Sequence, residues 1–554
     1  MQPGKVTRAM RQRGGTGMVI AVIAVVLTMA GLVAWLLLNP TTRPQREAGE
    51  IIPSNAGAVV SFYPSRLVNK SGLPDFLREH LDDLGGMAMM INPNQLDTLA
   101  DFTKLGIRED RPVHLFFQKG KNGPRAGLIL PLISREAFEK GMKENMPGNF
   151  GDEILKQMTE ERDLRGIFSG QWPFVFAYDH HSLVLLFEEP QFGENSMNLG
   201  AALHELFDQE SGLSSAEPSF ARYVSAEHDF GYWIKLEMLP GLLGEEMVKN
   251  LDQLNAQLQG VTTMGIRFEP GEAILDLMLA GKNRLPLRPV DPELLKTIPD
   301  DSALIFAGGV DLKAIGEQVA ATLEGDNGLI KQLGDEVPVD KLREIIQNLT
   351  GGENIDLDAQ FTGDVVLALT DFEMKKITKT PLIPLPLPDD LQLPSPKLHL
   401  AGSFKTKANA DTEALLKQFK LTEALGLEAF AREGIIHLAS PALRESLEQN
   451  GMVPNPVDDS TREQIGGRGA SFILNFNRLL KVLDKFPKQR AAAARLEPLE
   501  SLALTLDSSN EESHAVIKLR LHNKEINALR QMVEMGTSLP TSEEDSSTVE
   551  EEKR

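Results

Sequence analysis

The chain has 554 residues, of which 42% are hydrophobic and 25% charged, as in globular proteins that bury an apolar core. It contains no cysteine, which excludes disulfides, thiolate metal sites, a cysteine nucleophile and a lipidated cysteine anchor. Residues 1–46 carry six basic side chains and no acidic one, so the rest of the chain has a net charge of −28 (−22 − 6). Because such an acidic body repels phosphate backbones, we expect no nucleic-acid partner.

The N-terminal residues predict a membrane anchor. Residues 17–38 are apolar and uncharged, and a helix of this length can cross about 30 Å of hydrocarbon. Residues 1–16 are basic, which predicts that they stay in the cytoplasm, and residues 39–50 form a polar linker. A signal peptide cleaved after Ala30 is the alternative, but the apolar run continues beyond that point and is too long for the apolar region of a signal peptide. We therefore predict a single-pass protein of the inner (cytoplasmic) membrane, with its N-terminus inside and its body periplasmic.

The first half of the body, residues 51–285, begins with Ile52-Pro53 and alternates strands with helices. Two pairs of strands are separated by turn signals, Asp179–Ser182 and Pro270-Gly271, which predict hairpins. The predicted strands span residues 58–63, 113–118, 127–133, 174–178, 183–187, 230–236, 262–268 and 273–279.

The second half, residues 298–536, repeats this order. Ile298-Pro299 follows Ile52-Pro53 by 246 residues (299 − 53), and the later strands recur at an offset of about 240. The predicted strands span residues 303–306, 364–369, 398–404, 434–438, 470–476, 502–506 and 515–521. Residues 286–297, with three prolines, indicate a linker between the halves, and residues 537–554 a disordered acidic tail.

These elements predict an α+β fold. We expect an N-terminal transmembrane helix followed by two duplicated halves of mainly antiparallel sheet, with helices packed on one face of each sheet.

Short motifs give the chain a resemblance to known proteins. They are Ile52-Pro53, Asn69-Lys70-Ser71-Gly72-Leu73, Pro218-Ser219-Phe220 and Asp229-Phe230-Gly231-Tyr232-Trp233. With these motifs the chain resembles a bacterial cell-envelope family classed as a domain of unknown function, whose members often look like lipoproteins. The resemblance implies an envelope role and brings no catalytic residues. Leu27–Gly31 resembles a lipobox, but Leu32 stands where the lipidated cysteine would be, so the anchoring mode does not transfer.

No motif predicts catalysis, a cofactor or a metal site. Asp179-His180-His181 has metal-ligating residue types, but no further histidine lies at ligand spacing, so a polar turn is favoured. His204-Glu205 lacks the second histidine of a zinc-binding helix, and Asp356-Leu357-Asp358 lacks the other ligands of a calcium loop. Gly466–Gly469 precedes a strand, whereas a phosphate-binding loop follows one.

A proline- and leucine-rich segment, residues 381–397, has no counterpart in the first half. Its composition predicts polyproline II, because proline fixes φ and lacks an N–H. It is either a stiff loop whose leucines pack on the body or an arm that docks a partner. The candidate partner-binding residues are Pro381, Pro384, Pro386, Pro388, Pro394 and Pro396.

We expect a non-enzymatic binding or scaffold protein of the cell envelope, held at the membrane by its N-terminal segment and contacting other envelope proteins. Two alternatives stay open. One is an envelope hydrolase with a carboxylate-lined cleft between the halves, and the other is a carrier of an apolar ligand.

Overall fold

The structure is a computed structural model. It describes residues 48–79, 101–120, 124–145, 150–168, 174–188, 197–238, 260–280, 286–314, 357–377, 393–418, 426–483, 496–509 and 512–537. The chain forms two compact units. Unit 1 comprises Met1–Ala273 and Asn523–Arg554, and unit 2 comprises Ile274–His522.

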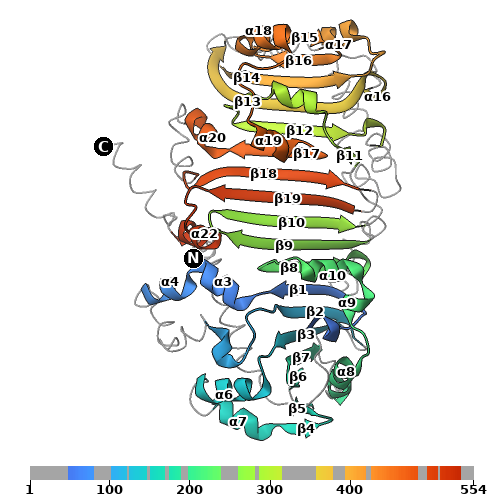
Figure 1. Cartoon of the computed structure of the whole chain (residues 1–554), viewed down its shortest axis with the longest axis vertical. Helices are drawn as coiled ribbons and strands as arrows, with labels where there is room; N and C mark the ends of the chain where they lie inside the picture. Colours follow the sequence, from blue (N-terminus) through green and yellow to red (C-terminus); the bar gives the residue numbers. More distant parts are fainter. Residues whose placement is uncertain are drawn as a thin grey trace, which may run out of the picture. The chain divides into compact units, whose positions relative to one another are not determined.

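Unit 1 is built on an antiparallel sheet (Figure 1). Its strands are β1 (Ala56–Phe62), β2 (Val113–Lys119), β3 (Pro124–Pro131), β4 (Thr159–Glu161), β5 (Leu164–Ile167), β6 (Phe174–Tyr178), β7 (Ser182–Glu188), β8 (Phe230–Lys235) and β9 (Val261–Glu269). Their pairing gives the order β4-β5-β6-β7-β3-β2-β1-β8-β9. The strand centres are almost continuously apolar, which is typical of strands buried on both faces.

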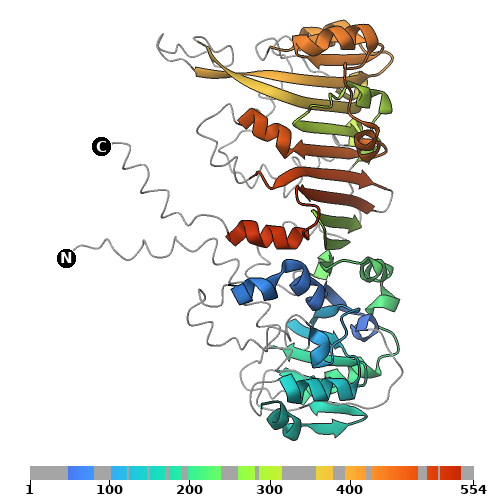
Figure 2. The ribbon, with the colours of Figure 1, turned by 60° about the vertical axis from the view of Figure 1, so that its left-hand side comes forward.

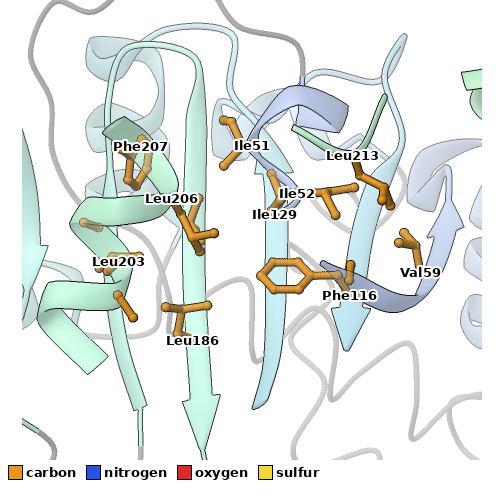
Figure 3. Close-up of a cluster of buried hydrophobic side chains, with 14 of the residues drawn as sticks. Ile51, Ile52, Val59, Phe116, Ile129, Leu186, Leu203, Leu206, Phe207 and Leu213 are labelled. Carbon is orange, nitrogen blue, oxygen red and sulfur yellow. The ribbon is translucent and has the colours of Figure 1, made fainter. Parts of the chain in front are cut away.

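Helices cover both faces of this sheet. Along β3, Leu128 and Leu130 belong to one buried cluster and Ile129 to another, since successive side chains of a strand point to opposite faces. The cluster around Ile129, part of which Figure 3 shows, includes side chains from α2 (Ala48–Ile51), α8 (Met197–Asp208), α9 (Leu213–Ala216) and α10 (Pro218–Ser225). The other cluster includes side chains from α3 (Pro64–Ser71), η2 (Phe102–Leu105), α6 (Arg135–Asn145) and α7 (Phe150–Gln157). Unit 1 also contains α4 (Leu73–Glu79) and η3 (Leu236–Met238).

Unit 2 has an antiparallel sheet in which several strands are longer than the sequence predicts. Its strands are β10 (Glu272–Ala280, which begins at the unit boundary), β11 (Leu287–Arg288), β12 (Leu304–Val310), β13 (Phe361–Ile377), β14 (Leu393–Thr406), β15 (Glu428–Arg432), β16 (Ile435–Ala439), β17 (Ala470–Asn475), β18 (Leu499–Ser508) and β19 (Glu512–Leu521). Pairing gives the order β15-β16-β14-β13-β12-β17-β18-β19, and β11 pairs with the end of β12.

Short helices complete unit 2. They are η4 (Pro292–Thr297), α16 (Leu357–Gln360), α17 (Thr412–Gln418), α18 (Pro441–Asn450), α19 (Asp459–Ile465) and α20 (Phe476–Leu483). Leu294 and Leu295 of η4 and Ile465 of α19 pack in one cluster with Ala307 of β12 and Val366 of β13. Residues 286–297, predicted as a linker, thus contain β11 and η4, and two leucines of η4 are buried.

The same pairing order occurs in both units. β6-β7-β3-β2-β1-β8-β9 in unit 1 corresponds to β15-β16-β14-β13-β12-β17-β18 in unit 2. The register also corresponds. Ala58 pairs with Ile234 in unit 1, and Leu304 pairs with Leu474 in unit 2. Leu304 follows Ala58 by 246 residues (304 − 58), and Leu474 follows Ile234 by 240 (474 − 234). The peptide N–H of Leu213 donates to Ile52 O, and that of Val457 donates to Ile298 O, each at 2.9 Å. The Ile-Pro dipeptides therefore occupy corresponding places in the two sheets.

The predicted fold class is wrong. The described residues form nineteen strands in antiparallel pairings, with some short helices. In unit 1 the helices pack on both faces of the sheet, because both rows of side chains along its strands are apolar. None of the described helices has the length and apolar character needed to span a bilayer. The predicted transmembrane residues 17–38, the basic residues 1–16 and the tail beyond Thr537 lie outside the described residues.

The last helix, α22 (Ala528–Thr537), belongs to unit 1, although it follows the last strand of unit 2. It packs against α3 and β9. Asn527 Nδ2 donates to Phe268 O at 2.9 Å, and the N–H of Gly271 donates to Ile526 O at 2.9 Å. From the sequence these residues are predicted to belong to the second repeat, because periodicity says nothing about where a terminal helix packs.

Candidate binding surface

Two of the motifs behind the family resemblance meet in a salt bridge. Lys70 lies in the last turn of α3, and Asp229 precedes β8, 159 residues later. Lys70 Nζ donates to both carboxylate oxygens of Asp229, at 2.9 and 2.8 Å, and Asp229 Oδ2 also accepts the N–H of Phe268 at 2.8 Å. Asp229 is buried, so the pair joins α3 to β8 and β9 and has a structural role.

The other motifs pack around Trp233. Trp233 Nε1 donates to Ser219 Oγ at 3.1 Å, and the Phe220 ring meets the indole edge-on at 5.5 Å. Gly231 lies two residues earlier, where a Cβ atom would approach Met264 O to 2.3 Å and Tyr223 Oη to 3.1 Å. These residue types are therefore explained by packing under α10.

The buried carboxylates offer no free acid or base. Among the described residues these are Asp179, Glu188, Asp229 and Asp364. Glu188 Oε2 accepts from Arg125 at 2.9 and 3.2 Å, and Asp364 accepts from Arg288 at 2.9 and 2.6 Å. Asp179 Oδ1 accepts two backbone N–H groups, so each of these carboxylates has a charged or backbone partner.

Among the described residues, each unit has a buried serine–histidine pair. Ser61 Oγ lies 2.8 Å from His114 Nδ1, and Ser403 Oγ lies 2.9 Å from His437 Nδ1. Burial lowers the pKa of both His114 and His437 to about 4, so they are neutral at pH 7.

The direction of the hydrogen bonds settles the role of the second pair. Thr297 Oγ1 donates to Leu294 O, and Ser403 Oγ donates to Thr297 Oγ1 at 2.9 Å. Ser403 therefore accepts its bond from the Nδ1–H of His437. A nucleophilic serine gives its proton to histidine, which is the opposite direction.

The other chemistry-bearing residues considered in the sequence occupy turns and helix surfaces. Asp179 caps the hairpin between β6 and β7 through the N–H groups of His181 and Ser182, each at 2.8 Å, and burial raises the pKa of this aspartate. His204 stacks on Phe168 and lies 3.2 Å from Glu161. No group of three metal-ligating side chains occurs within the described ranges. Gly467 has a φ of 74° in the turn before β17, and Asp356 lies outside the described residues.

One face of the unit 2 sheet carries large apolar side chains that are only half-buried. The register places Leu304 beside Leu369 and Leu474, and Leu504 beside Phe472 and Ile517, on one face. We call this set the leucine face: Leu304, Phe306, Val365, Leu367, Leu369, Leu400, Phe404, Phe472, Leu474, Leu502, Leu504, Leu506, Ile517 and Leu519.

The opposite face of the same strands is different. There, Ala307, Val366, Ala368 and Ala503 are small and buried. The first three pack in one cluster with residues of η4 and α19. The helix α20 lies against β13, β17 and β18. A sheet that pairs small, buried residues on one face with large, half-buried ones on the other presents its larger apolar area on the second face.

The candidate prolines fall into two groups. Pro381, Pro384, Pro386 and Pro388 lie outside the described residues. Pro394 and Pro396 lie in β14, opposite Lys376 and Met374 of β13, so the end of the predicted polyproline loop is a strand instead. Proline is tolerated there because β16 pairs only with Ala401–Lys405 of β14, leaving the prolines on a free edge of that strand among the described residues.

The leucine face is not among the features predicted from the sequence. Its signal is present in β18, where Leu502, Leu504 and Leu506 alternate with Ala503 and Thr505. Alternation of large with small apolar residues, rather than of apolar with polar ones, indicates two unequal apolar faces.

Comparisons with known proteins identify no family. No family model and no curated protein matches the chain. A structure of TP0453 in crystal form IV is 13% identical, with a TM-score of 0.24, covering 43% of this chain and 81% of that one. A structure of TP0453 in crystal form I is 14% identical, with a TM-score of 0.22, covering 44% and 81%. Scores this low carry no argument about the fold or function of this protein.

Proposed function

We propose that the protein is a non-catalytic binding protein of the cell envelope and that it takes up an apolar ligand against the leucine face. The observation that carries the proposal is the half-buried state of large leucine, isoleucine and phenylalanine side chains across six adjacent strands. Removing the remaining apolar area from water would stabilise a complex by about 25 cal/mol per Å². A continuous apolar surface is typical of a binding site.

The partners of the buried polar groups favour binding over hydrolysis. A carboxylate hydrolase needs two convergent acids, of which one is held protonated by its surroundings. The buried carboxylates described above are held by Lys70, Arg125, Arg288 or backbone N–H groups, which keep them in structural roles.

The proposed location is the extracytoplasmic side of the cytoplasmic membrane. It rests on the sequence, in which basic residues 1–16 precede the uncharged residues 17–38 and an acidic body follows. The family resemblance of the motifs described above supports an envelope role, and contact with other envelope proteins is part of the proposal. Nucleic acid is not among the proposed partners, because the body is strongly acidic.

The test is a titration of the purified full-length chain with a fluorescent long-chain fatty acid. Ile517 and Lys518 are neighbours on β19, but Ile517 lies opposite Leu504 on the leucine face and Lys518 lies opposite Ala503 on the other. We expect Ile517→Gln to weaken binding about fivefold, since half-burial of isoleucine is worth about 1 kcal/mol. Lys518→Gln should bind as the parent does. Absence of saturable binding by the parent chain would contradict the proposed function.

A further inference from the structure

The strand β10 extends the unit 2 sheet beyond β19, as Figure 1 and Figure 2 show. Within unit 2 it comprises Ile274–Ala280, and one polar pair of side chains joins it to β19. His514 Nε2 of β19 lies 2.6 Å from Asp276 Oδ1 of β10, although the two residues are 238 apart in the sequence. The pair therefore links two strands that meet only in the folded sheet.

This link lies on the face opposite to the leucine face. His514 is three positions before Ile517 on β19, so the two side chains point to opposite faces of the sheet. Asp276 reaches His514 and shares its face, so the neighbours Leu275 and Leu277 point to the leucine face, where both are half-buried. Holding β10 on β19 thus adds two leucines to the leucine face.

Negative charge surrounds His514. Among the described residues, the carboxylates that face it are Asp276, Asp507 opposite it on β18, and Glu512 on its own strand. Arg468 Nη1 donates to Asp507 Oδ2 at 2.6 Å, which offsets part of this charge. The hydrogen bond with Asp276, together with the surrounding carboxylates, raises the pKa of His514 above its usual 6.5, against an opposing effect of burial.

We propose that the pair of His514 and Asp276 is a pH-dependent latch that holds β10 on β19. When His514 is protonated, the two groups form a charge-assisted hydrogen bond, and when it is neutral the attraction between charges is lost. The latch belongs to the chain itself and goes beyond the proposed function, since it holds β10 whether or not a ligand lies on the leucine face.

The direction of the pH dependence follows from the raised pKa of His514. The folded chain binds this proton more tightly than the unfolded chain does, so the pair stabilises the sheet fully below about pH 6.5. The stabilisation is then lost as the pH rises through the higher pKa of the folded chain. The latch is therefore closed in mildly acidic solution and weakened in alkaline solution.

Hydrogen exchange of the full-length chain at pH 6 and pH 8.5 tests the latch. His114 and His437, whose pKa is about 4, stay neutral over this range. After correction for the intrinsic exchange rate, amides of β10 and of β19 near His514 should exchange about twofold to fivefold faster at pH 8.5, as for loss of one partly exposed ion pair. Amides of β12 and β13 should not change.

Two substitutions remove the latch in different ways. His514→Gln removes the titrating group, and Asp276→Asn removes the negative charge but keeps an oxygen acceptor. In both variants, β10 should exchange equally at the two pH values. His522→Gln is the matched control, because His522 is an exposed histidine directly after the end of β19. This variant should keep the response of the parent.

Proton NMR of the imidazoles is a second measurement, made on the parent chain. The resonance that is missing in His514→Gln should titrate with a midpoint above 6.5, and Asp276→Asn should lower this midpoint. A midpoint at or below 6.5 in the parent would overturn the latch.

Three exchange results would also overturn it. They are equal protection of β10 in the parent at both pH values, a pH response that survives in His514→Gln and Asp276→Asn, and a response that His522→Gln removes. No ligand takes part in these measurements, so failure of the latch leaves the proposed function standing.

Discussion

At the scale of single residues, the groups that could carry chemistry are used to hold strands together. Ser403 of β14 accepts a hydrogen bond from His437 of β16 and donates one to Thr297 of η4. Lys70 of α3 forms a salt bridge with Asp229, which precedes β8. Both histidines are neutral because burial penalises their charged form. This arrangement has a consequence for stability that can be measured.

The buried histidines predict acid sensitivity. The pKa of His114 and His437 is about 4 in the folded chain and about 6.5 when unfolded, so the unfolded chain binds more protons between these values. Stability should be full above about pH 6.5 and fall as the pH drops toward 4, by up to about 3 kcal/mol for each histidine.

Urea denaturation between pH 7 and pH 4 checks this. His114→Gln and His437→Gln should each flatten the dependence of unfolding free energy on pH, whatever they do to stability at pH 7. An unchanged slope in both variants would show that these histidines are not the source of acid sensitivity.

At the scale of elements, strand length and helix position depend on contacts far along the chain. Pro394 and Pro396 argue against a strand when the segment is taken alone, yet β14 begins at Leu393. The prolines are tolerated because the neighbouring strand β16 pairs with β14 only from Ala401 onward. Similarly, α22 follows β19 in the chain but packs in unit 1 through Asn527 and Ile526.

The position of α22 predicts the effect of truncation. A chain ending at His522 lacks the hydrogen bonds to Phe268 O and Gly271 N and the buried Ala528, so unit 1 should lose about 2 kcal/mol of unfolding free energy. Hydrogen exchange should become faster in α3 and β9 and stay unchanged in β12 to β18. A chain ending at Thr537 is the control. Faster exchange confined to unit 2 would contradict the assignment of α22.

At the scale of the whole molecule, the sequence predicts the order of the strands better than it predicts which helices cover the sheet. The apolar runs and the turn at Asp179 to Ser182 are local, so β6 and β7 can be located from composition and spacing. The covering of both faces of the unit 1 sheet by helices depends on contacts between segments that are far apart in the sequence. Leu128, Ile129 and Leu130 predict a buried strand, but only the fold shows that α6 covers one face and α8 the other.

In the candidate site, too, the sequence indicates local features but not the residues that the fold brings together. The six prolines stand out by composition, but the two that the structure describes are strand residues beside Met374 and Lys376. The leucine face is assembled from β12, β13, β14, β17, β18 and β19, which span more than 200 residues of sequence, so no single segment indicates it.

Binding at the leucine face is tested most directly by a single label. Because the chain has no cysteine, Ile517→Cys or Lys518→Cys gives one thiol for an environment-sensitive fluorophore, on the leucine face or on the opposite face of β19. On addition of palmitate, the label at 517 should shift saturably to shorter emission wavelengths, while the label at 518 should not change. An equal response at both positions, or none at 517 while palmitate binds, would contradict binding at the leucine face.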